Sequence, residues 1–404
     1  MNNNPQNDST ISLADRYMFQ TYSRFPLTLV RGEGCRVWDE EGREYLDFVG
    51  GIAVCALGHS SPIVSRVLKE QSEMLVHVSN LYYTRPQMEL ARLLVENSFA
   101  DKVFFCNSGA EANEAAIKLA RRYSNEKFGQ DRRTIISMDN SFHGRTMATL
   151  SATGQTKIQT GYDPLLGGFK FVPFNDINGL DQALDVSVCA VMLEPIQGEG
   201  GVVCPSPPYL KKVRELCNQR NALLIFDEVQ VGMGRTGKLF AHQHYGVVPD
   251  IMTLAKALGN GLPIGAMLST EELAKAFGPG SHATTFGGTP LVSAVSHAVL
   301  KSILEDGRLE HCQSMGDYLK KGLERLSRKH GLIKEVRGLG LILGVEMDQP
   351  GGPVVDACLE QGLLINCAQE NVLRFLPPLI VRKQEIDLLI GTLDKIFQGM
   401  RIEN

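Results

Sequence analysis

The 404-residue sequence has no apolar run close to the roughly 18–20 residues that a membrane span requires. It contains nine cysteines but no C-x-x-C pair and no Cys/His spacing typical of a metal site. Residues 1–10 are polar and have neither the basic nor the apolar segment of a signal peptide, which favours a frayed tail. We therefore expect a cytoplasmic protein with reduced thiols, no metal site and no membrane partner.

The sequence also has little excess of either positive or negative charge. The 41 Lys and Arg residues and 45 Asp and Glu residues give a net charge of −4, without a long single-sign run. Such a surface has no field suited to a polyanion, so we expect no nucleic-acid partner. At roughly 100–200 residues per domain, the length allows two to three domains, and a hydrophobic content of 43% is ordinary for a globular enzyme.

Short apolar runs alternate with helix-like segments through the middle of the chain. This alternation predicts βα units that build a mostly parallel sheet flanked by helices. The predicted strands are residues 103–106, 134–138, 188–193, 222–226 and 251–254. After about residue 290 we expect a smaller α+β domain, with helices at 294–305 and 312–328 and short strands near 341–345 and 363–365.

Residues 34–51 have the pattern of a hairpin, with strands at 36–38 and 45–48 around a turn at 39–42. We predict that residues 1–60 form an N-terminal segment that contributes to the smaller domain. The large α/β domain is expected at 61–292, and the C-terminal small α+β domain at 293–404.

The first motif is a strand, a turn of small residues and an Ala-rich helix across residues 103–120. If the helix begins near Ala110, its free N–H groups and the Ser108 hydroxyl would face a bound anion. An ordinary turn capped by Asn107 or Ser108 would have the same pattern. This stretch alone does not decide between a phosphate site and a simple helix cap.

The second motif is an apolar strand that runs directly into Asp227 and Glu228. A carboxylate at the carboxyl end of a parallel strand is a candidate functional group. The same pattern describes the Walker B element of an ATPase, and residues 232–239 nearly match a P-loop. However, Leu239 stands where a hydroxyl is required and no helix-forming stretch follows, so ATPase activity is a minor alternative. Residues 338–344 resemble a dinucleotide-binding motif with the wrong spacing, and we expect a strand to continue through them.

The third motif places Lys256 among apolar neighbours within residues 250–265. A lone Lys is usually a solvated surface charge, but an apolar environment lowers its pKa, as a Schiff-base amine requires. The three motifs together supply an anion site, an acid at a strand end and an amine. These are the groups that pyridoxal 5'-phosphate (PLP) needs.

On these motifs the chain resembles the class III aminotransferases of the fold-type I PLP family. The resemblance extends from about Pro26 to Pro378. It includes Phe-Val-Gly-Gly-Ile-Ala-Val at 48–54, Asn-Ser-Gly-Ala-Glu-Ala-Asn at 107–113, Phe-His-Gly-Arg at 142–145, Glu-Pro-Ile-Gln-Gly-Glu-Gly-Gly at 194–201 and Thr-Thr-Phe-Gly-Gly at 284–288. It implies that the large domain binds PLP and that the protein is a homodimer.

The resemblance also implies roles for residues that contact the cofactor. Lys256 is the Schiff-base lysine and moves the proton, while Asp227 pairs with the pyridine nitrogen. Gln230 is expected to hydrogen-bond to the phenolic oxygen, Phe142 to stack on the ring and His143 to stand beside it. The phosphate is assigned to Ser108, Gly109 and Ala110, together with Thr285 of the other subunit.

Substrate recognition is implied in the same way. Arg145 resembles the residue that binds the distal carboxylate, and Arg374 the residue that binds the α-carboxylate of glutamate. Glu199 is expected to cap Arg374 while a terminal-amine donor is bound, and Thr284 to contact the acylated donor. Glu194 belongs to the same motif as Glu199 and is also assigned to the substrate site.

Within the class, the chain is most similar to acetylornithine and succinylornithine aminotransferases. This implies transfer of the terminal amino group of N2-acetyl-L-ornithine to 2-oxoglutarate in arginine biosynthesis. The alternatives are succinylornithine, ornithine and 4-aminobutyrate as donors. By resemblance, Ile52 stands where ornithine δ-aminotransferases have a tyrosine that faces the free α-amino group, and an apolar residue there suits an acylated, uncharged nitrogen. Tyr83 aligns near a second tyrosine of those enzymes, so plain ornithine stays open as a donor. A cofactor-free binding protein on this scaffold would be expected to have lost Lys256.

Overall fold

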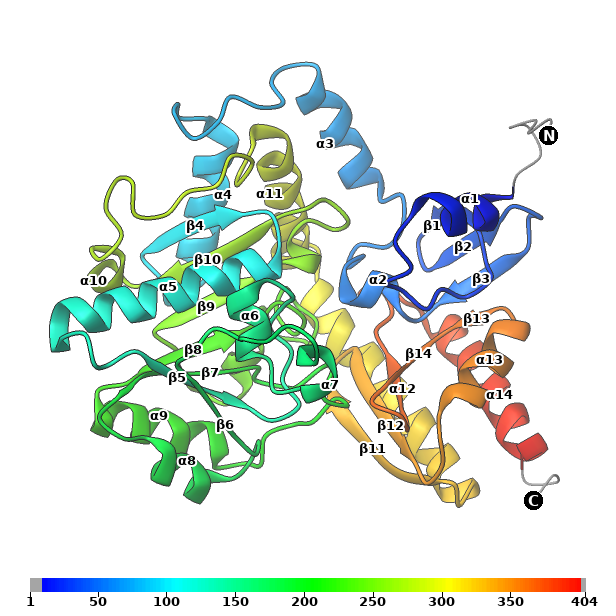
Figure 1. Cartoon of the computed structure of the whole chain (residues 1–404). Coiled ribbons are helices and arrows are strands. Elements are labelled where there is room, and N and C mark those ends of the chain that lie inside the picture. The colour runs from blue at the N-terminus through cyan, green and yellow to red at the C-terminus, as the bar shows by residue number, and fades with distance from the viewer. Residues whose placement is uncertain (1–8, 401–404) are drawn as a thin grey trace.

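A seven-stranded sheet forms the centre of the larger lobe in the computed structural model, which describes residues 9–400 (Figure 1). Residues 1–8 of the predicted polar tail lie outside the described residues, whereas Ser9 caps a helix that begins at Thr10. Neighbouring strands are parallel except for β10, which is antiparallel to both β4 and β9, so the predicted mostly parallel sheet is confirmed. The strand order is β4 (Lys102–Cys106), β10 (Gly265–Ser269), β9 (Ile251–Leu254), β8 (Leu223–Asp227), β7 (Val188–Leu193), β5 (Thr134–Met138) and β6 (Phe169–Val172).

Both faces of this sheet are covered, which explains why its strands are continuous apolar runs. In β8, Ile225 packs into the core beneath α5 (Gly109–Phe128), whereas Leu224 and Phe226 pack into the core beneath α9 (Tyr209–Arg220). Figure 1 shows α3 (Pro62–Ser72), α4 (Arg85–Glu96) and α11 (Pro290–Glu305) gathered at one end of this lobe. The shorter helices are α6 (Met147–Ala152), α7 (Thr156–Gln159), α8 (Ile177–Ala183) and α10 (Glu271–Ala274).

The smaller lobe contains two four-stranded sheets. The first sheet contains the predicted hairpin, which is confirmed by the pairing of Arg36 with Leu46. In this sheet the hairpin is joined by one further strand from the N-terminal part of the chain and one from the C-terminal part. Its order is β1 (Leu29–Glu33), β2 (Arg36–Asp39), β3 (Glu44–Asp47) and β13 (Leu363–Leu364). The second sheet consists of β11 (Ile333–Leu339), β12 (Ile342–Met347), β15 (Val372–Phe375) and β14 (Asn366–Ala368). The helices are α1 (Thr10–Tyr17), α12 (Arg308–Lys329), α13 (Gly352–Glu360) and α14 (Lys383–Met400).

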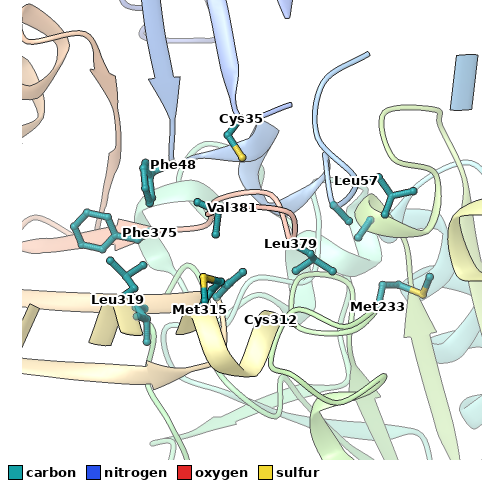
Figure 2. Packing of buried hydrophobic residues seen from close by; sticks show 14 of the residues in the cluster. Cys35, Phe48, Leu57, Met233, Cys312, Met315, Leu319, Phe375, Leu379 and Val381 are labelled. Atoms are coloured by element: carbon teal, nitrogen blue, oxygen red, sulfur yellow. The ribbon is translucent and has the colours of Figure 1, made fainter. Parts of the chain in front are cut away.

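The parallel pairing of β13 with β3 places a C-terminal strand beside the N-terminal segment. A shared core then joins these segments to the larger lobe. Figure 2 shows this core, in which Phe48 of the N-terminal segment, Met233 of the larger lobe and Phe375 of β15 belong to one buried cluster. Because this one core crosses residues 60 and 292, the domain division at those residues stays a proposal.

Two local predictions need correction. Residues 338–344 are not one strand, because β11 and β12 form an antiparallel hairpin around Gly340. Gly340 has a φ of +55°, and a Cβ there would lie 2.5 Å from the Thr236 carbonyl carbon, so the turn requires glycine. The second correction concerns β8, which was predicted at residues 222–226 but begins at Leu223 and ends at Asp227.

A left-handed turn follows β3 and leads to the functional cavity. Gly50, Gly51, Ile52 and Ala53 of α2 (Gly50–Ala53) all have φ between +55° and +65°. This conformation is unusual for a β-branched residue such as Ile52.

Among the described helices, none is long and apolar enough to cross a membrane.

Candidate active site

One cavity of about 470 Å3 lies where β4, β8 and β9 end. These three strands run in the same direction, so the residues after them meet at one edge of the sheet. The cavity brings together most of the predicted site residues, namely Ser108, Gly109, Ala110, Phe142, His143, Arg145, Glu194, Glu199, Asp227, Gln230 and Lys256.

The N-terminus of α5 forms an anion-binding turn in the wall of this cavity. Ser108 is the N-cap, and its Oγ accepts a hydrogen bond from the Glu111 N–H at 3.2 Å. The N–H groups of Gly109 and Ala110 have no acceptor in the described chain and so are free for a ligand. A Cβ at Gly109 would lie 2.7 Å from Val229 Cγ1, so this turn also requires the absence of a side chain. The two interpretations of this motif are therefore compatible, because Ser108 caps a helix whose first N–H groups remain available.

Asp227 ends β8 with a buried carboxylate that is oriented from several sides. Its Oδ2 accepts hydrogen bonds from Asn113 Nδ2 at 2.7 Å and from His143 Nδ1 at 2.8 Å. Its Oδ1 accepts one from the Val229 N–H at 3.0 Å. Each carboxylate oxygen has two lone pairs, so Oδ1 can accept one more hydrogen bond. That acceptor suits the protonated nitrogen of an aromatic ring.

Lys256 follows β9 and begins the 3-10 helix η2 (Lys256–Leu258). Its φ of +47° is a left-handed conformation, of the kind that is often held at functional sites. Burial lowers the pKa of its amine below the usual range, against the opposing charge of Glu199. No described residue forms a hydrogen bond with its Nζ. An amine with a lowered pKa and no hydrogen-bond partner is suited to attack a carbonyl group.

Arg374 of β15 lies behind Glu199 and is only 1% exposed. Its Nη1 donates to Glu199 Oε1 at 2.6 Å and to Gln230 Oε1 at 3.1 Å. Burial acts to raise the pKa of Glu199, but the adjacent guanidinium prevails and holds this pKa below its ordinary value. Glu199 therefore contacts Arg374, as the resemblance implies, and its role as a cap while a terminal-amine donor is bound stays a prediction.

Glu194 contributes to the cavity mainly as a backbone anchor. Its two carboxylate oxygens accept from the Phe142 N–H at 3.1 Å and the Gly198 N–H at 3.2 Å. Burial raises its pKa to about 7. Glu194 thus fixes the backbone at Phe142, whose ring lies 5.7 Å from the Arg145 guanidinium carbon. Its predicted contact with substrate stays a prediction.

Some predicted residues do not line this cavity. Thr284 and Thr285 line a neighbouring cavity of about 1060 Å3, although Thr284 Oγ1 accepts a hydrogen bond from Asn107 Nδ2 at 3.0 Å. Ile52 and Tyr83 also lie outside the lining and are 41% and 95% exposed. Their proposed roles therefore depend on groups beyond this single cavity.

The geometry contradicts the ATPase alternative. Glu228 is buried and accepts hydrogen bonds from the N–H groups of Ala241 and His242 at 2.7 and 2.8 Å, so it caps the 3-10 helix η1 (Ala241–His244). Its carboxylate is therefore not free to hold a nucleotide-bound metal. The glycine-rich loop at 232–239 instead buries Arg235, which donates to the carbonyls of Leu341 and Pro377 in the smaller lobe.

Sequence reasoning assigned no role to several residues of the cavity wall, including Val54, Asn113, Val229 and the segment 261–264. Asn113 lies in the same motif as Ser108, one turn into α5, and this position is a signal that points toward the site. The others are apolar or glycine residues, and nothing in the sequence distinguishes them from ordinary core positions.

PLP carries a phosphate, an aldehyde and a protonated ring nitrogen, and the cavity has a group for each. The α5 turn suits the phosphate, Lys256 the aldehyde and Asp227 the ring nitrogen. The residues therefore fit this cofactor.

Comparisons with known proteins agree with this geometry. The family model described as Aminotransferase class-III matches residues 17–397. The acetylornithine aminotransferase of Caldanaerobacter subterraneus subsp. tengcongensis is 55% identical over 97% of this chain and 100% of its own length. That of Methanocaldococcus jannaschii is 52% identical over 98% and 99%.

Solved structures give the same picture. N-acetylornithine aminotransferase from Stenotrophomonas maltophilia superposes with a TM-score of 0.85 at 40% identity, covering 98% of this chain and 100% of that one. Ornithine aminotransferase from Toxoplasma gondii superposes with a TM-score of 0.95 at 34% identity, covering 99% and 98%.

Proposed function

This chain belongs to the class-III aminotransferases, and on that premise we propose that it transfers the terminal amino group of N2-acetyl-L-ornithine to 2-oxoglutarate. The products are N-acetylglutamate 5-semialdehyde and glutamate, which places the reaction in arginine biosynthesis. Enzymes of this family use PLP. The observation that carries the proposal is the contact of buried Arg374 with half-buried Glu199 beside Lys256, because it prepares the cavity for a donor without an α-carboxylate near the reacting carbon. The acyl group is inferred from the relatives, which are acetylornithine aminotransferases.

When bound, PLP supplies an aldehyde that takes up the amino group and a ring that withdraws electrons. The chain's own residues do the rest. Ser108 and the free N–H groups after it would hold the phosphate, and Asp227 would keep the proton on the ring nitrogen. Lys256 Nζ would take a proton from the substrate carbon that bears the amine and deliver it to the aldehyde carbon of the cofactor. The second half-reaction would need the same transfer in the opposite direction. The lowered pKa of Lys256 gives it an unprotonated fraction that a solvated lysine lacks.

The two half-reactions present different carboxylates to the same cavity. With Glu199 on Arg374, the charge of Arg374 is neutralised, and Arg145 is the guanidinium that lines the described cavity. The α-carboxylate of acetylornithine then binds Arg145. For glutamate, the α-carboxylate replaces Glu199 on Arg374, and the side-chain carboxylate binds Arg145. Glu199 therefore acts as a charge switch between the two substrates.

We also propose that two copies of the chain form a homodimer whose active sites are shared. Large apolar side chains are exposed next to the cavity that Thr284 and Thr285 line: Leu81 is 81% exposed, Tyr83 95% and Phe286 63%. A monomer rarely exposes such a patch, which favours an interface. The cytoplasmic location inferred from the sequence stays a prediction.

Subunit mixing tests the shared site. A mixed dimer of Lys256→Ala and Thr285→Ala subunits has one site with both native residues only if Thr285 acts across the interface. We expect mixing of the two weak variants to restore activity. If the mixture is no more active than the better parent, Thr285 does not act in this way. Analytical ultracentrifugation over a dilution series gives the oligomeric state independently.

The donor is tested by single-turnover absorbance. The purified holoenzyme is mixed with N-acetylornithine, succinylornithine, ornithine or 4-aminobutyrate while the visible band of the cofactor is followed. We expect acetylornithine to bleach the band fastest and 2-oxoglutarate to restore it. Faster bleaching by another donor would replace the substrate assignment. A wild-type protein that takes up no PLP would overturn the proposed function, and Lys256→Ala serves as the inactive control.

A further inference from the structure

Asp227 is held by a buried network that the sequence did not reveal. Asn113 Nδ2 donates to Asp227 Oδ2 at 2.7 Å and to the His143 carbonyl at 2.8 Å. Asn113 Oδ1 accepts the hydroxyl of Thr253 at 2.7 Å. We infer that Asn113 and Thr253 are positioning residues that set the orientation of the Asp227 carboxylate toward the ring nitrogen of PLP. This inference rests on the proposed function.

The network fixes the orientation of the Asn113 amide. Asp227 Oδ2 and the His143 carbonyl oxygen only accept, so the two N–H bonds of the amide face them and its oxygen accepts the hydroxyl of Thr253. A flipped amide would lose its hydrogen bonds to Asp227 and to the His143 carbonyl and would place its oxygen against two acceptors. Thr253 therefore acts on Asp227 through Asn113.

His143 reaches the same carboxylate oxygen from another direction. Its Nδ1 lies 2.8 Å from Asp227 Oδ2, and its Nε2 lies 3.1 Å from Ser137 Oγ. Because an ionised carboxylate only accepts, Nδ1 carries the proton at this contact. Asn113 and His143 thus occupy Oδ2 together, whereas Oδ1 accepts only the Val229 N–H among residues 9–400. The network leaves Oδ1 as the oxygen that faces an incoming N–H donor.

The positions of these residues argue against a general packing role. Thr253 is the one polar residue of β9, between buried Met252 and Leu254. Asn113 is 1% exposed on the face of α5 that otherwise buries Ala112 and Ala116. A buried polar side chain in such surroundings is destabilising unless it is hydrogen-bonded, and an apolar residue would pack there without that requirement. What the polar pair adds is one oriented donor to a charged carboxylate.

The test uses variants that preserve shape. Thr253→Val removes the hydroxyl, Thr253→Ser restores it, and Asn113→Leu removes the amide. Ser293→Ala is the matched control, because the Ser293 hydroxyl is buried without a hydrogen-bond partner among the described residues. Each holoenzyme is examined by equilibrium dialysis for the dissociation constant of PLP, and by nitrogen-15 NMR of ring-labelled PLP for protonation of the ring nitrogen. Thermal unfolding is measured alongside.

We expect Thr253→Val to weaken PLP binding about tenfold, Asn113→Leu to weaken it about tenfold to a hundredfold, and both to move the nitrogen-15 signal toward the unprotonated ring. Thr253→Ser is expected to restore both readouts to near wild type, and Ser293→Ala to change neither. A lower unfolding temperature with unchanged binding and nitrogen-15 signal would overturn the inference, since a merely structural role predicts that result. If Asn113→Leu fails to fold, the Thr253 pair decides. A failure of the proposed function would be distinguished from a failure of this inference, because the wild-type protein itself would then take up no PLP.

Discussion

Replacing Glu199 tests how one cavity handles two different carboxylates. In the structure Glu199 Oε1 lies 2.6 Å from Arg374 Nη1 and 3.1 Å from Gln230 Nε2. Glu199→Ala removes the carboxylate and leaves the buried guanidinium with Gln230 and Asn366 as partners. An α-carboxylate that enters the cavity then meets an uncapped cation in both half-reactions. The donor selectivity should therefore move from terminal amines toward α-amino acids.

The magnitude follows from the contact that is lost. A hydrogen bond to a charged group is worth about 1.5–3 kcal/mol, and about 1.4 kcal/mol corresponds to a factor of ten. Glutamate no longer has to displace Glu199, so the ratio of kcat/KM for glutamate to that for acetylornithine should rise about 10-fold to 100-fold. Glu199→Gln keeps the shape and a neutral acceptor for Arg374, so its ratio should lie between those of the wild type and Glu199→Ala.

The assay compares single-turnover rates of the two donors in each variant. Glu370→Gln, an exposed charge-neutralising change, is the control and should leave the ratio unchanged. A fall in both rates by the same factor would indicate general damage to the site. A ratio that stays within about twofold of the wild-type value in Glu199→Ala would refute the charge-switch reasoning.

Three further predictions concern stability and the anion-binding turn. Burial lowers the pKa of Lys256 below 10.5, so the unfolded chain binds this proton more tightly than the folded chain. The free energy of unfolding of the cofactor-free protein should therefore fall as the pH drops below 10.5. Urea titrations of Lys256→Met should lack this pH dependence. Glu194 affects the free energy of unfolding in the opposite direction, because its pKa is raised from 4.5 to about 7. The stability that it contributes below pH 4.5, up to about 3 kcal/mol, is lost as the pH rises through about 7. Urea titrations at about pH 5 and about pH 8 check this against Glu194→Gln, which removes the slope. Gly265→Ala would place a Cβ 2.3 Å from the Ser108 carbonyl oxygen and should weaken PLP binding more than about tenfold in equilibrium dialysis, whereas Gly391→Ala, where a Cβ meets nothing within 4 Å, should not.

The sheet was predictable because its strands obey a simple rule. The strands β5, β7 and β9 coincide with their predicted ranges, since a strand covered on both faces is a continuous apolar run. The end of β8 differs because Asp227 pairs with Thr253 in the ladder, although its side chain is polar. The turn at Gly340 was missed because its left-handed φ depends on the close approach of Thr236, which is far away in the sequence.

The site was predictable in part, and for a different reason. Ser108 and Lys256 follow strands and Asp227 ends one, so their positions at one edge of the sheet follow from the fold. Nothing local relates Glu199 to Arg374, which are 175 residues apart, and their pairing came only from the resemblance. The contact between Asn113 and Thr253 is equally non-local and had no signal beyond the position of Asn113 in its motif.

The proposed charge switch of Glu199 and Arg374 lies where the two lobes meet, and this placement bears on how it can move. Arg374 belongs to the smaller lobe, whereas Glu199 follows β7 of the larger lobe. The backbone around Glu199 is tied to the smaller lobe by Gln369 Nε2, which donates to the Glu199 carbonyl at 2.8 Å, and by Arg337 Nε, which donates to the Gly201 carbonyl at 3.0 Å. With the backbone held at both points, we expect Glu199 to leave Arg374 by side-chain rotation. Glutamate would then displace the cap without separation of the two lobes.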